Sequence, residues 1–316
     1  MRSQRLIRLF IVVSLSSANA WAVQRTFVSA ATGDDANPCS RALPCRSFAA
    51  AIVLADPDGE VIVLDSGGYG AVAVLQPVSL ISPSGVHAAI TAFSGNAITV
   101  NAGDPARVVL RNLALSSQGG TNGIEADTVA ALHIEGCLIS GFSDTGIMFA
   151  PTTSGARLYV DNTIVRRSGN SGINVTGGTD IWASIESARL YQNGVGAYAQ
   201  GARATIRKSI AAGSTYEGFG ALFAPDVDVE DSVAMNNSIG FSTAFSTMTV
   251  VRCEVTSNAK GMSAQSFSTI YVSDSTIASN VLGLDSQFMS TIASRGNNTL
   301  EANTTNGGFS GSFPAQ

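Results

Sequence analysis

The sequence is poor in charged side chains and histidine, and it has no long apolar run beyond its first residues. Charged residues make up 13% of the 316 positions and there are two His, whereas about a quarter of the residues of a typical soluble domain are charged. Beyond residue 22 no segment supplies the roughly 18 to 20 uninterrupted apolar residues that a membrane span requires. We therefore expect no membrane insertion and no zinc site built from several His.

The first 22 residues have the pattern of an export signal. Three Arg among the first eight residues accompany an apolar stretch from Leu6 to Leu15, and small-residue cleavage sites follow at 18–20 and 20–22. We predict a signal peptide over residues 1–22 and a secreted or periplasmic protein. Loss of that segment leaves 15 basic against 23 acidic side chains, a balance that disfavours a nucleic-acid partner.

What the sequence has in abundance is glycine, with 32 residues, and a repeat that begins near residue 108. Eight segments share a template with apolar or small residues at positions 1, 3, 6 and 8: 108–115, 132–139, 158–165, 183–190, 204–211, 227–234, 248–255 and 270–277. Each is followed by one repeat glycine: Gly123, Gly146, Gly172, Gly196, Gly220, Gly240, Gly261 and Gly283. A fixed period of this length is typical of a solenoid.

Each unit alternates apolar and polar residues over three to five positions, which indicates short strands and no helix. We predict an all-β fold, a single-stranded right-handed parallel β-helix (β-solenoid) of about nine to eleven coils. Leucine-rich repeats have a similar period, but their Leu-rich consensus is missing. Four Asn precede a repeat glycine by three residues, and we expect their side chains to stack at a tight turn: Asn193, Asn237, Asn258 and Asn280.

The amino-terminal segment differs from the repeat and has the features of a cap. Residues 46–55 form a plausible short helix that the turn 56–59 ends, and residues 60–65 read as the first strand. A solenoid needs such a cover over its open end. We therefore divide the chain into an N-terminal cap with a short helix and first strand (23–66), β-helix coils (67–310) and a C-terminal tail (311–316).

A resemblance to a known superfamily joins these features. The cap and first coils look like the entry region of the pectate-lyase-like β-helix superfamily, through the segments 26–35, 44–52, 59–65, 68–70 and 77–81. The later coils are similar to its broad right-handed β-helix region family. The likeness covers residues 25 to about 310. It implies the architecture, but this fold carries many different activities.

The four cysteines separate into two classes. Cys39 and Cys45 lie six residues apart in a loop flanked by Pro, and we predict that they form a disulfide in an oxidising compartment. Cys137 and Cys253 both occupy position 6 of the template, five coils apart. That separation is roughly 24 Å at the strand spacing of a sheet, so we expect two buried free thiols and no shared metal.

Position 4 of the template forms a charged column on the outside of the solenoid: Arg111, Glu135, Asp161, Glu186, Arg207, Glu230, Val251 and Ser273. Three stacked acids repel one another unless a Ca²⁺ ion or a proton neutralises them. His133 and Tyr159 at position 2, with Arg207 and Lys208, complete the candidate surface. The alternative is a ladder of solvated ion pairs, Arg111 with Glu135 and Glu186 with Arg207, each contributing at most about 1 kcal/mol.

Two further columns have mainly structural interpretations. Four acids, Asp226, Asp228, Glu230 and Asp231, are expected to pair with Arg207, Lys208 and Arg252 of neighbouring coils. Four phenylalanines recur every 21 to 22 residues: Phe223, Phe245, Phe267 and Phe288. We expect these rings to form an internal stack, with an exposed platform for sugar rings as the alternative.

Function is less constrained than fold. The leading hypothesis is an exported, non-catalytic solenoid that binds glycan or another cell-surface partner. The resemblance implies the first alternative, a Ca²⁺-dependent polysaccharide lyase that binds the ion through Glu135, Asp161 and Glu186 and uses Arg207, Lys208 or His133 in catalysis. Whichever function holds, the candidate binding residues are Glu135, Asp161, Glu186, Tyr159 and Arg111. The second alternative is a self-assembling protein whose last coil, residues 291–313, stacks end to end on another copy. No cofactor other than possible Ca²⁺ is expected.

Overall fold

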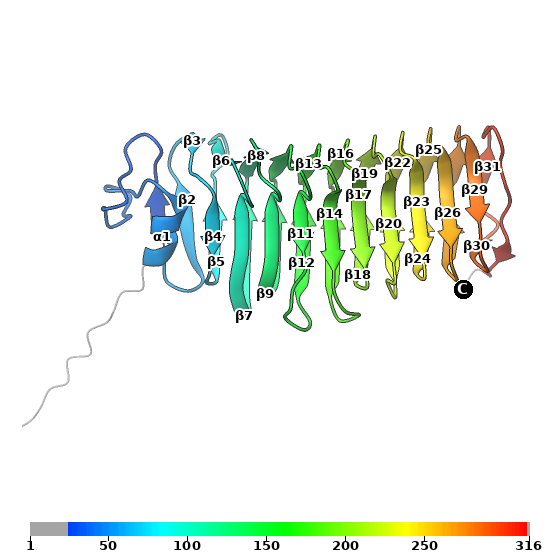
Figure 1. Ribbon diagram of the computed structural model, residues 1–316, viewed down its shortest axis with the longest axis horizontal. Helices are drawn as coiled ribbons and strands as arrows, with labels where there is room; N and C mark the ends of the chain where they lie inside the picture. The colour runs from blue at the N-terminus through cyan, green and yellow to red at the C-terminus, as the bar shows by residue number, and fades with distance from the viewer. Residues whose placement is uncertain (1–24, 315–316) are drawn as a thin grey trace, which may run out of the picture.

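The chain forms an elongated stack of parallel strands with one short helix at its amino-terminal end (Figure 1). The computed structural model describes residues 25–314, so the predicted signal peptide over 1–22 lies outside the described residues. One of the two sheets has 11 strands and supplies one strand per coil. The solenoid therefore has about eleven coils, as the repeat predicts. No helix within residues 25–314 is long and apolar enough to cross a membrane.

The coils present three strand-lined faces. The first face contains β1 (Arg25–Val28), β2 (Gly59–Val63), β5 (Val78–Ile81), β7 (Ile98–Arg111), β9 (Ile124–Glu135), β12 (Arg157–Asp161), β15 (Trp182–Glu186), β18 (Arg203–Arg207), β21 (Val227–Glu230), β24 (Thr247–Val251), β27 (Thr269–Ser273), β30 (Thr291–Ser294) and β32 (Gly311–Ser312). Neighbouring strands of this face come from consecutive coils and pair in parallel, for example β12 with β15 and β15 with β18.

The second face joins the first through the long strands β7 and β9. It continues with β4 (Val72–Val74), β11 (Ile147–Phe149), β14 (Ser171–Thr176), β17 (Val195–Gln200), β20 (Glu217–Leu222), β23 (Ile239–Ala244), β26 (Lys260–Gln265) and β29 (Leu282–Ser286). The third face is the 11-stranded sheet: β3 (Gly67–Gly68), β6 (Ala88–Ala92), β8 (Leu113–Ser117), β10 (Leu138–Ser140), β13 (Ile164–Arg166), β16 (Arg189–Tyr191), β19 (Ile210–Ala212), β22 (Val233–Met235), β25 (Glu254–Thr256), β28 (Thr276–Ala278) and β31 (Thr299–Glu301).

Strand alternation decides which side chains enter the core. In β12, Leu158 and Val160 are buried while Tyr159 between them faces outward, because successive side chains of a strand point to opposite sides. The pairing of Leu158 with Leu132 and Ala183 confirms the predicted register. Each template segment thus begins on a first-face strand, turns a corner at positions 5 and 6 and ends on a third-face strand. The interior is one continuous cluster of such columns.

The repeat glycine of one coil differs from the prediction. Gly218, not Gly220, stands in the glycine column, where an added Cβ would lie 2.8 Å from the carbonyl oxygen of Gly240 and 2.9 Å from Nδ2 of Asn237. Gly220 follows two residues later and pairs with Tyr198 on the second face. Both glycines precede small or apolar residues, but Gly218 lies 22 residues from both Gly196 and Gly240, a regular spacing that the sequence already contains.

The predicted asparagine stack is present and buried. Nδ2 of Asn237 donates to Oδ1 of Asn258 (3.1 Å), Asn258 donates to Asn280 (3.0 Å), and Asn280 donates to Asn303 (2.9 Å). Asn193 is not in this chain of bonds, because Ser214 occupies the stack position of the intervening coil and its backbone N–H bonds to Asn237. The left-handed residue of each turn is the one before the stacked Asn, for example Ser257 with φ 58°, so the Asn themselves are selected by hydrogen bonding.

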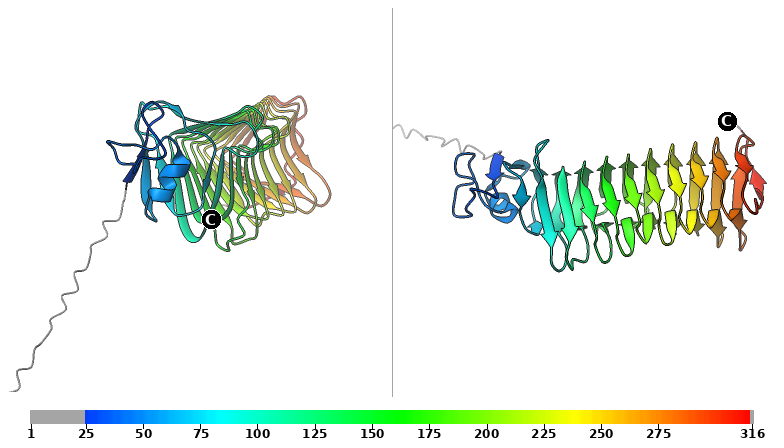
Figure 2. Two further views of the ribbon diagram at one scale, coloured as in Figure 1. Left: turned by 60° about the vertical axis from the view of Figure 1, so that its left-hand side comes forward. Right: turned by 90° about the horizontal axis from the view of Figure 1, so that it is seen from above.

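The amino-terminal helix covers the first coil as predicted. Helix α1 (Phe48–Leu54) begins after Ser47, whose hydroxyl accepts a hydrogen bond from the backbone N–H of Ala50, the usual way of satisfying a free N–H at a helix start. Figure 2 shows the helix at one end of the solenoid. Phe48 is buried and its ring lies 5.3 Å from that of Tyr69. The helix is therefore anchored to the core that it covers.

The cysteines are arranged as predicted. Cys39 and Cys45 form a disulfide in the loop before α1. Cys137 and Cys253 are buried free thiols, and burial raises the pKa of each to about 12. Each thiol contacts backbone carbonyl oxygens, with Cys253 Sγ 3.3 Å from the carbonyl of Val251, so both act as small core residues.

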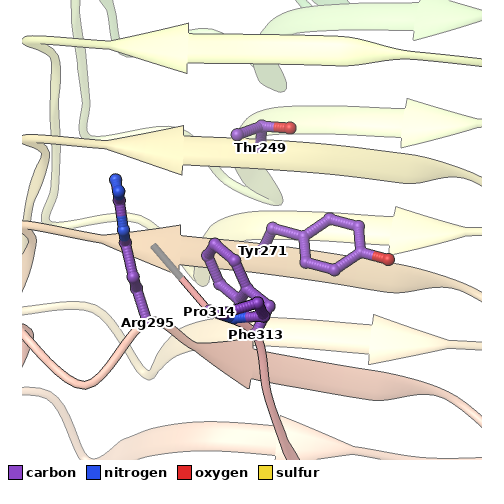
Figure 3. Close-up of a pocket in the computed structure, with 5 residues that line it drawn as sticks. All are labelled: Thr249, Tyr271, Arg295, Phe313 and Pro314. Atoms are coloured by element: carbon purple, nitrogen blue, oxygen red, sulfur yellow. The ribbon is translucent and has the colours of Figure 1, made fainter. Parts of the chain in front are cut away.

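The carboxyl-terminal segment returns across the last coil. Strand β32 pairs with β30, the partly buried Phe309 packs against the core, and the ring of Phe313 meets that of Tyr271 edge-on at 5.3 Å. Together with Arg295 these two rings border a surface cavity (Figure 3). The segment after β31 therefore covers part of the end at which another copy was expected to stack. End-to-end association stays a prediction that a size measurement in solution tests.

Candidate functional site

The predicted charged column lies on the first face in the expected order. Arg111 pairs with Glu135 on the next coil, Glu135 with Asp161, Asp161 with Glu186, and Glu186 with Arg207. A parallel column two residues earlier along each strand carries His133, Tyr159 and Ser184. Residues two apart in a strand face the same side, so both columns lie on one surface.

A shallow depression lies between these columns. Its cavity volume is about 190 Å³, and it is lined by His133, Glu135, Tyr159, Val160, Asp161, Ser184 and Glu186. Thus the structure brings together the three predicted acids, His133 and Tyr159. Arg111 lies one coil before Glu135, and Arg207 and Lys208 follow on the coil after Glu186, so these three residues border the depression and do not line it.

An aromatic cluster adjoins the depression. The rings of His133 and Tyr159 stack with their centres 4.4 Å apart, and Trp182 meets Tyr159 edge-on at 5.8 Å. The guanidinium carbon of Arg157 lies 5.8 Å from the centre of the Trp182 ring, a cation–π distance. Sequence reasoning missed Trp182 and Arg157 because they stand one position before the template. Extending the outward columns by that one position would have found both.

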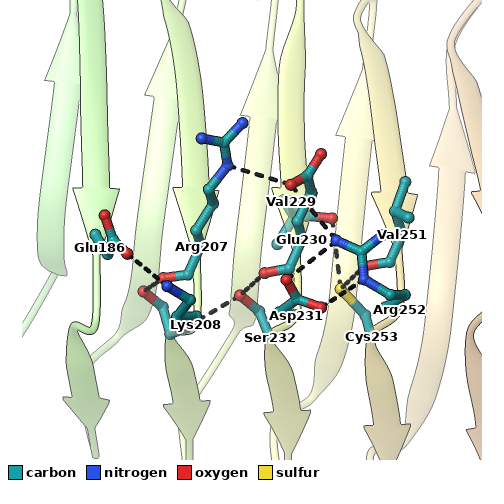
Figure 4. A network of polar contacts seen from close by, with 11 residues as sticks. Glu186, Arg207, Lys208, Val229, Glu230, Asp231, Ser232, Val251, Arg252 and Cys253 are labelled. Carbon is teal, nitrogen blue, oxygen red and sulfur yellow. Dashed lines mark hydrogen bonds and ion pairs between the residues drawn. The ribbon is translucent and has the colours of Figure 1, made fainter.

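The ion pairs agree with the prediction at one end of the column and differ at the other. Arg111 Nε lies 2.7 Å from Glu135 Oε2, as expected. The predicted pair of Glu186 with Arg207 is wrong: Lys208 Nζ binds Glu186 at 2.9 Å, and Arg207 Nε binds Glu230 of the following coil at 3.2 Å (Figure 4). Lys208 occupies the left-handed turn with φ 48°, and from there its side chain reaches back to the preceding coil.

The remaining acid run forms the predicted ion pairs in part. Arg252 binds Asp231 at 2.6 Å and lies 3.7 Å from Glu230 (Figure 4). Asp228 has no ion pair among the described residues, and its pKa is raised, first by burial and then by the charges of Asp226 and Glu230. Glu230 and Asp231 therefore form the predicted ion pairs, whereas Asp228 is repelled by neighbouring carboxylates.

Asp161 is the one acid of the predicted Ca²⁺ set that has no cationic partner within residues 25–314, since Glu135 and Glu186 bind Arg111 and Lys208. The same residues contain no group of three or more His, Cys, Asp or Glu side chains placed to hold a metal ion. The Ca²⁺ site thus stays a prediction that this geometry does not support. Asp161 is exposed and available to an incoming hydrogen-bond donor.

The candidate proton acceptors differ in protonation. Burial, and after it the charge of Arg107, lowers the pKa of His133, so its imidazole is neutral at pH 7 and able to accept a proton. The hydrogen bond and charge of Glu186 raise the pKa of Lys208, so its amine stays protonated and cannot serve as a base. Of the three predicted catalytic residues, His133 alone combines a neutral side chain with a place in the depression.

The phenylalanine column contradicts the expectation of an internal stack. Phe223, Phe245, Phe267 and Phe288 are 57%, 47%, 66% and 72% exposed, and neighbouring rings lie 4.9 and 6.3 Å apart. All four have left-handed backbones with φ between 50° and 59°. They stand at the turn between the second and first faces, where this conformation directs the side chain outward. The exposed alternative is therefore the one that the structure contains.

The fold defines the class of protein, a parallel β-helix with a polar and aromatic first face. The family model described as "Right handed beta helix region" matches residues 153–313, about half of the chain. The chain belongs to this family, and the predicted resemblance is confirmed. No curated protein matches the chain at a significant level.

Solved structures share the fold at low sequence identity. Tailspike protein 2 of Escherichia coli O157:H7 bacteriophage CAB120 has a TM-score of 0.58 and 10% identity, covering 78% of this chain and 39% of its own. The A-module of the Azotobacter vinelandii mannuronan C-5 epimerase AlgE4 has a TM-score of 0.53 and 10% identity over 82% and 91% of the two chains. Pectate lyase Pel9A has a TM-score of 0.48 and 14% identity over 92% and 78%. The chain spans about two fifths of the tailspike, and identities this low show the fold alone.

Proposed function

We propose that the protein is a secreted solenoid that binds an extended polysaccharide along its first face, with the depression around Tyr159 and Asp161 as the central subsite. The observation that carries this proposal is the Tyr159–Trp182 pair beside the carboxylates of a single depression. Aromatic rings offer apolar surface to the C–H groups of a sugar, while carboxylates accept hydrogen bonds from its hydroxyl groups.

The geometry suits a long ligand. The columns run along the solenoid axis with one residue per coil, about 4.8 Å apart, so equivalent contacts repeat in the direction in which a polysaccharide extends. Tyr159 and Trp182 are half-buried, which fixes their rings and lowers the entropy lost on binding. The epimerase with a similar fold is named for mannuronan, which adds support for a polysaccharide ligand.

The test is binding of the exported chain to a panel of neutral and acidic polysaccharides, measured by calorimetry or affinity electrophoresis. We expect the double variant Tyr159→Ala, Trp182→Ala to lose binding about tenfold or more, because each aromatic contact contributes roughly 0.5–1.5 kcal/mol. Tyr216→Ala, which removes an exposed tyrosine elsewhere, is the matched control. Equal loss in both variants, or no binding to any polysaccharide, contradicts the proposal.

A second candidate function, proton abstraction from a bound uronate, is favoured by the neutral His133 stacked on Tyr159. Such a step leads to elimination or epimerisation, and its base is one of the three catalytic candidates that the sequence predicts. We expect His133→Gln to abolish product formation while polysaccharide binding persists. Ultraviolet absorbance detects the unsaturated product of elimination and nuclear magnetic resonance detects epimerisation, each with and without added Ca²⁺. Absence of both products across polyuronates leaves the binding function alone.

A further inference from the structure

A second cavity lies at the edge of the third face, away from the acidic depression. Its volume is about 410 Å³, and it is lined by Arg166, Arg167, Tyr191, Gln192, Ala212, Gly213 and Asn236. These residues come from the ends of β13, β16 and β19, from the turns that follow them, and, for Asn236, from the turn after β22. The volume lies within the range of small-molecule sites.

The hollow arises from a step in side-chain size. Arg166, Tyr191, Ala212 and Met235 occupy one column of paired positions on consecutive coils, so the methyl group of Ala212 stands between two much longer side chains. Gly213 occupies the following turn with φ 71°, and an added Cβ there would meet no atom closer than 3.6 Å. The backbone at Gly213 is fixed by a hydrogen bond from its N–H to the Met235 carbonyl oxygen. The cavity is therefore a built feature of regular coils.

The lining is cationic in a protein with a net negative charge. The sequence has 18 basic and 23 acidic side chains, yet no lining residue of this cavity is acidic. Arg166 and Arg167 form no ion pair with any residue in the part of the chain that the structure describes; Arg166 Nε donates only to the Ser140 hydroxyl, at 3.2 Å. Adjacent like charges without a counter-charge favour binding of an anion.

From this geometry we infer that the cavity binds the oxyanion of an acidic saccharide unit, either a uronate carboxylate or a sulfate ester. The planar guanidinium groups of Arg166 and Arg167 suit paired hydrogen bonds to such oxygens. Tyr191 supplies an apolar flank for the sugar ring, and the amides of Gln192 and Asn236 supply donors and acceptors for its hydroxyl groups. This inference does not depend on the proposed function, because none of the first-face residues takes part.

The experiment titrates the full secreted chain with three oligosaccharides of equal length, one uronate, one sulfated and one neutral, and with inorganic sulfate. We expect one of the two acidic saccharides to bind, to bind more weakly as salt is added, and to lose affinity about tenfold or more in the double variant Arg166→Gln, Arg167→Asn. Asn is chosen at 167 because φ there is 56°, a conformation that Asn tolerates. Which saccharide binds identifies the oxyanion.

Two variants separate this site from other effects. Ala212→Leu fills the hollow without removing charge and is expected to block binding, with thermal unfolding as the check on folding. Arg189→Gln removes an exposed cation of the third face outside the cavity and should leave binding unchanged. The inference is overturned if neither acidic saccharide binds, or if the neutral saccharide or inorganic sulfate binds as tightly as the acidic saccharide. A loss of affinity in Arg189→Gln equal to that in the double variant overturns it as well.

Discussion

Two phenylalanine stacks lie in the same coils and have opposite surroundings. Phe219 and Phe241 are fully buried with ring centres 5.3 Å apart. Phe223 and Phe245 follow each of them by four residues and are 57% and 47% exposed, with centres 4.9 Å apart. Both pairs repeat with the coil and both stack. Periodicity and stacking therefore do not distinguish the inside of a solenoid from its outside.

The difference lies in the backbone. Phe219 and Phe241 stand in strands β20 and β23 and are directly paired, so strand alternation turns them inward. Phe223 and Phe245 come just after the same strands, with φ of 50° and 51°. The left-handed residue turns the chain from the second face towards the first, and its side chain leaves the alternation. Such a conformation costs a bulky residue roughly 1–3 kcal/mol, which the rest of the coil must offset.

The largest loss of stability is expected for a substitution in the buried phenylalanine stack. Phe241→Ala removes a fully buried ring and leaves a cavity between coils, so we expect a loss of about 3–5 kcal/mol in the free energy of unfolding. Chemical denaturation followed by circular dichroism measures it. Because a solenoid unfolds in units of neighbouring coils, the loss is expected to appear as an earlier partial transition.

Phe245→Ala is the matched control, because it removes the same side chain from the same coil. We expect it to cost about 1 kcal/mol or less, because its two ring contacts, with Phe223 and Phe267, are exposed to solvent. A loss in Phe245→Ala as large as that in Phe241→Ala would show that the outer rings are also shielded from water, and the contrast between the two stacks would fail.

The next largest loss of stability is expected in the buried asparagine stack. Asn258→Ala removes the Nδ2 donor to the Ala234 carbonyl and the Oδ1 acceptor for the Asn237 backbone N–H, leaving buried groups without partners. We expect a loss of about 1–3 kcal/mol in the free energy of unfolding. Hydrogen exchange of the backbone amide of Asn237, followed by nuclear magnetic resonance, reports the loss of its hydrogen bond to Asn258 directly.

The same column contains its own control. The Ser214 hydroxyl is buried without a hydrogen-bond partner among the described residues, and its backbone N–H, not its side chain, bonds to Asn237. Ser214→Ala should therefore leave stability unchanged or raise it slightly. If Ser214→Ala and Asn258→Ala lose stability equally, the cost reflects side-chain volume and not the hydrogen bonds of the ladder.

A smaller effect is expected for the outward charges of the first face. Glu135→Gln breaks the pair with Arg111, which is about half exposed, so solvent screening limits the loss to at most about 1 kcal/mol. The loss should shrink in high salt, as measured by thermal unfolding at two ionic strengths. Glu60→Gln, in the comparably exposed pair with Arg25, is expected to behave alike. A loss that is large and independent of salt would mean that Glu135 has a structural partner beyond Arg111.

Much of the fold follows from the sequence because the order of apolar and polar residues determines both the strand alternation and the length of each coil. The template register places Leu132, Leu158 and Ala183 in one column, as the structure does. The acid column and the burial of Cys137 and Cys253 follow from the same register. These predictions depend only on which residues are equivalent between coils.

The errors concern residues at turns and the directions of long side chains. Gly218 and Gly220 both precede a small or apolar residue, but the regular spacing of 22 residues to Gly196 and Gly240 and the close approach of the Gly240 carbonyl both select Gly218. Lys208 and Arg207 are neighbours of the same charge, but one stands in a turn and reaches back to Glu186 while the other reaches forward to Glu230. Such choices depend on φ and on rotamers, which an alternation of apolar and polar residues does not encode.

The smallest effect, and the sharpest test of the comparison, is expected at Phe267, which stacks on Phe245 in the outer column. Phe267 is 66% exposed, has φ 59° and lies 6.3 Å from Phe245. Phe267→Asn removes one weak ring contact and replaces a strained residue with one that tolerates the left-handed conformation, so the two changes oppose each other. We expect the free energy of unfolding to shift by less than about 0.5 kcal/mol, as for ordinary surface substitutions. The melting temperature of this variant, compared with that of Phe241→Ala, gives the result. A clear decrease would mean that the outer phenylalanines stabilise the coil. No decrease would mean that the exposed rings do not contribute to folding.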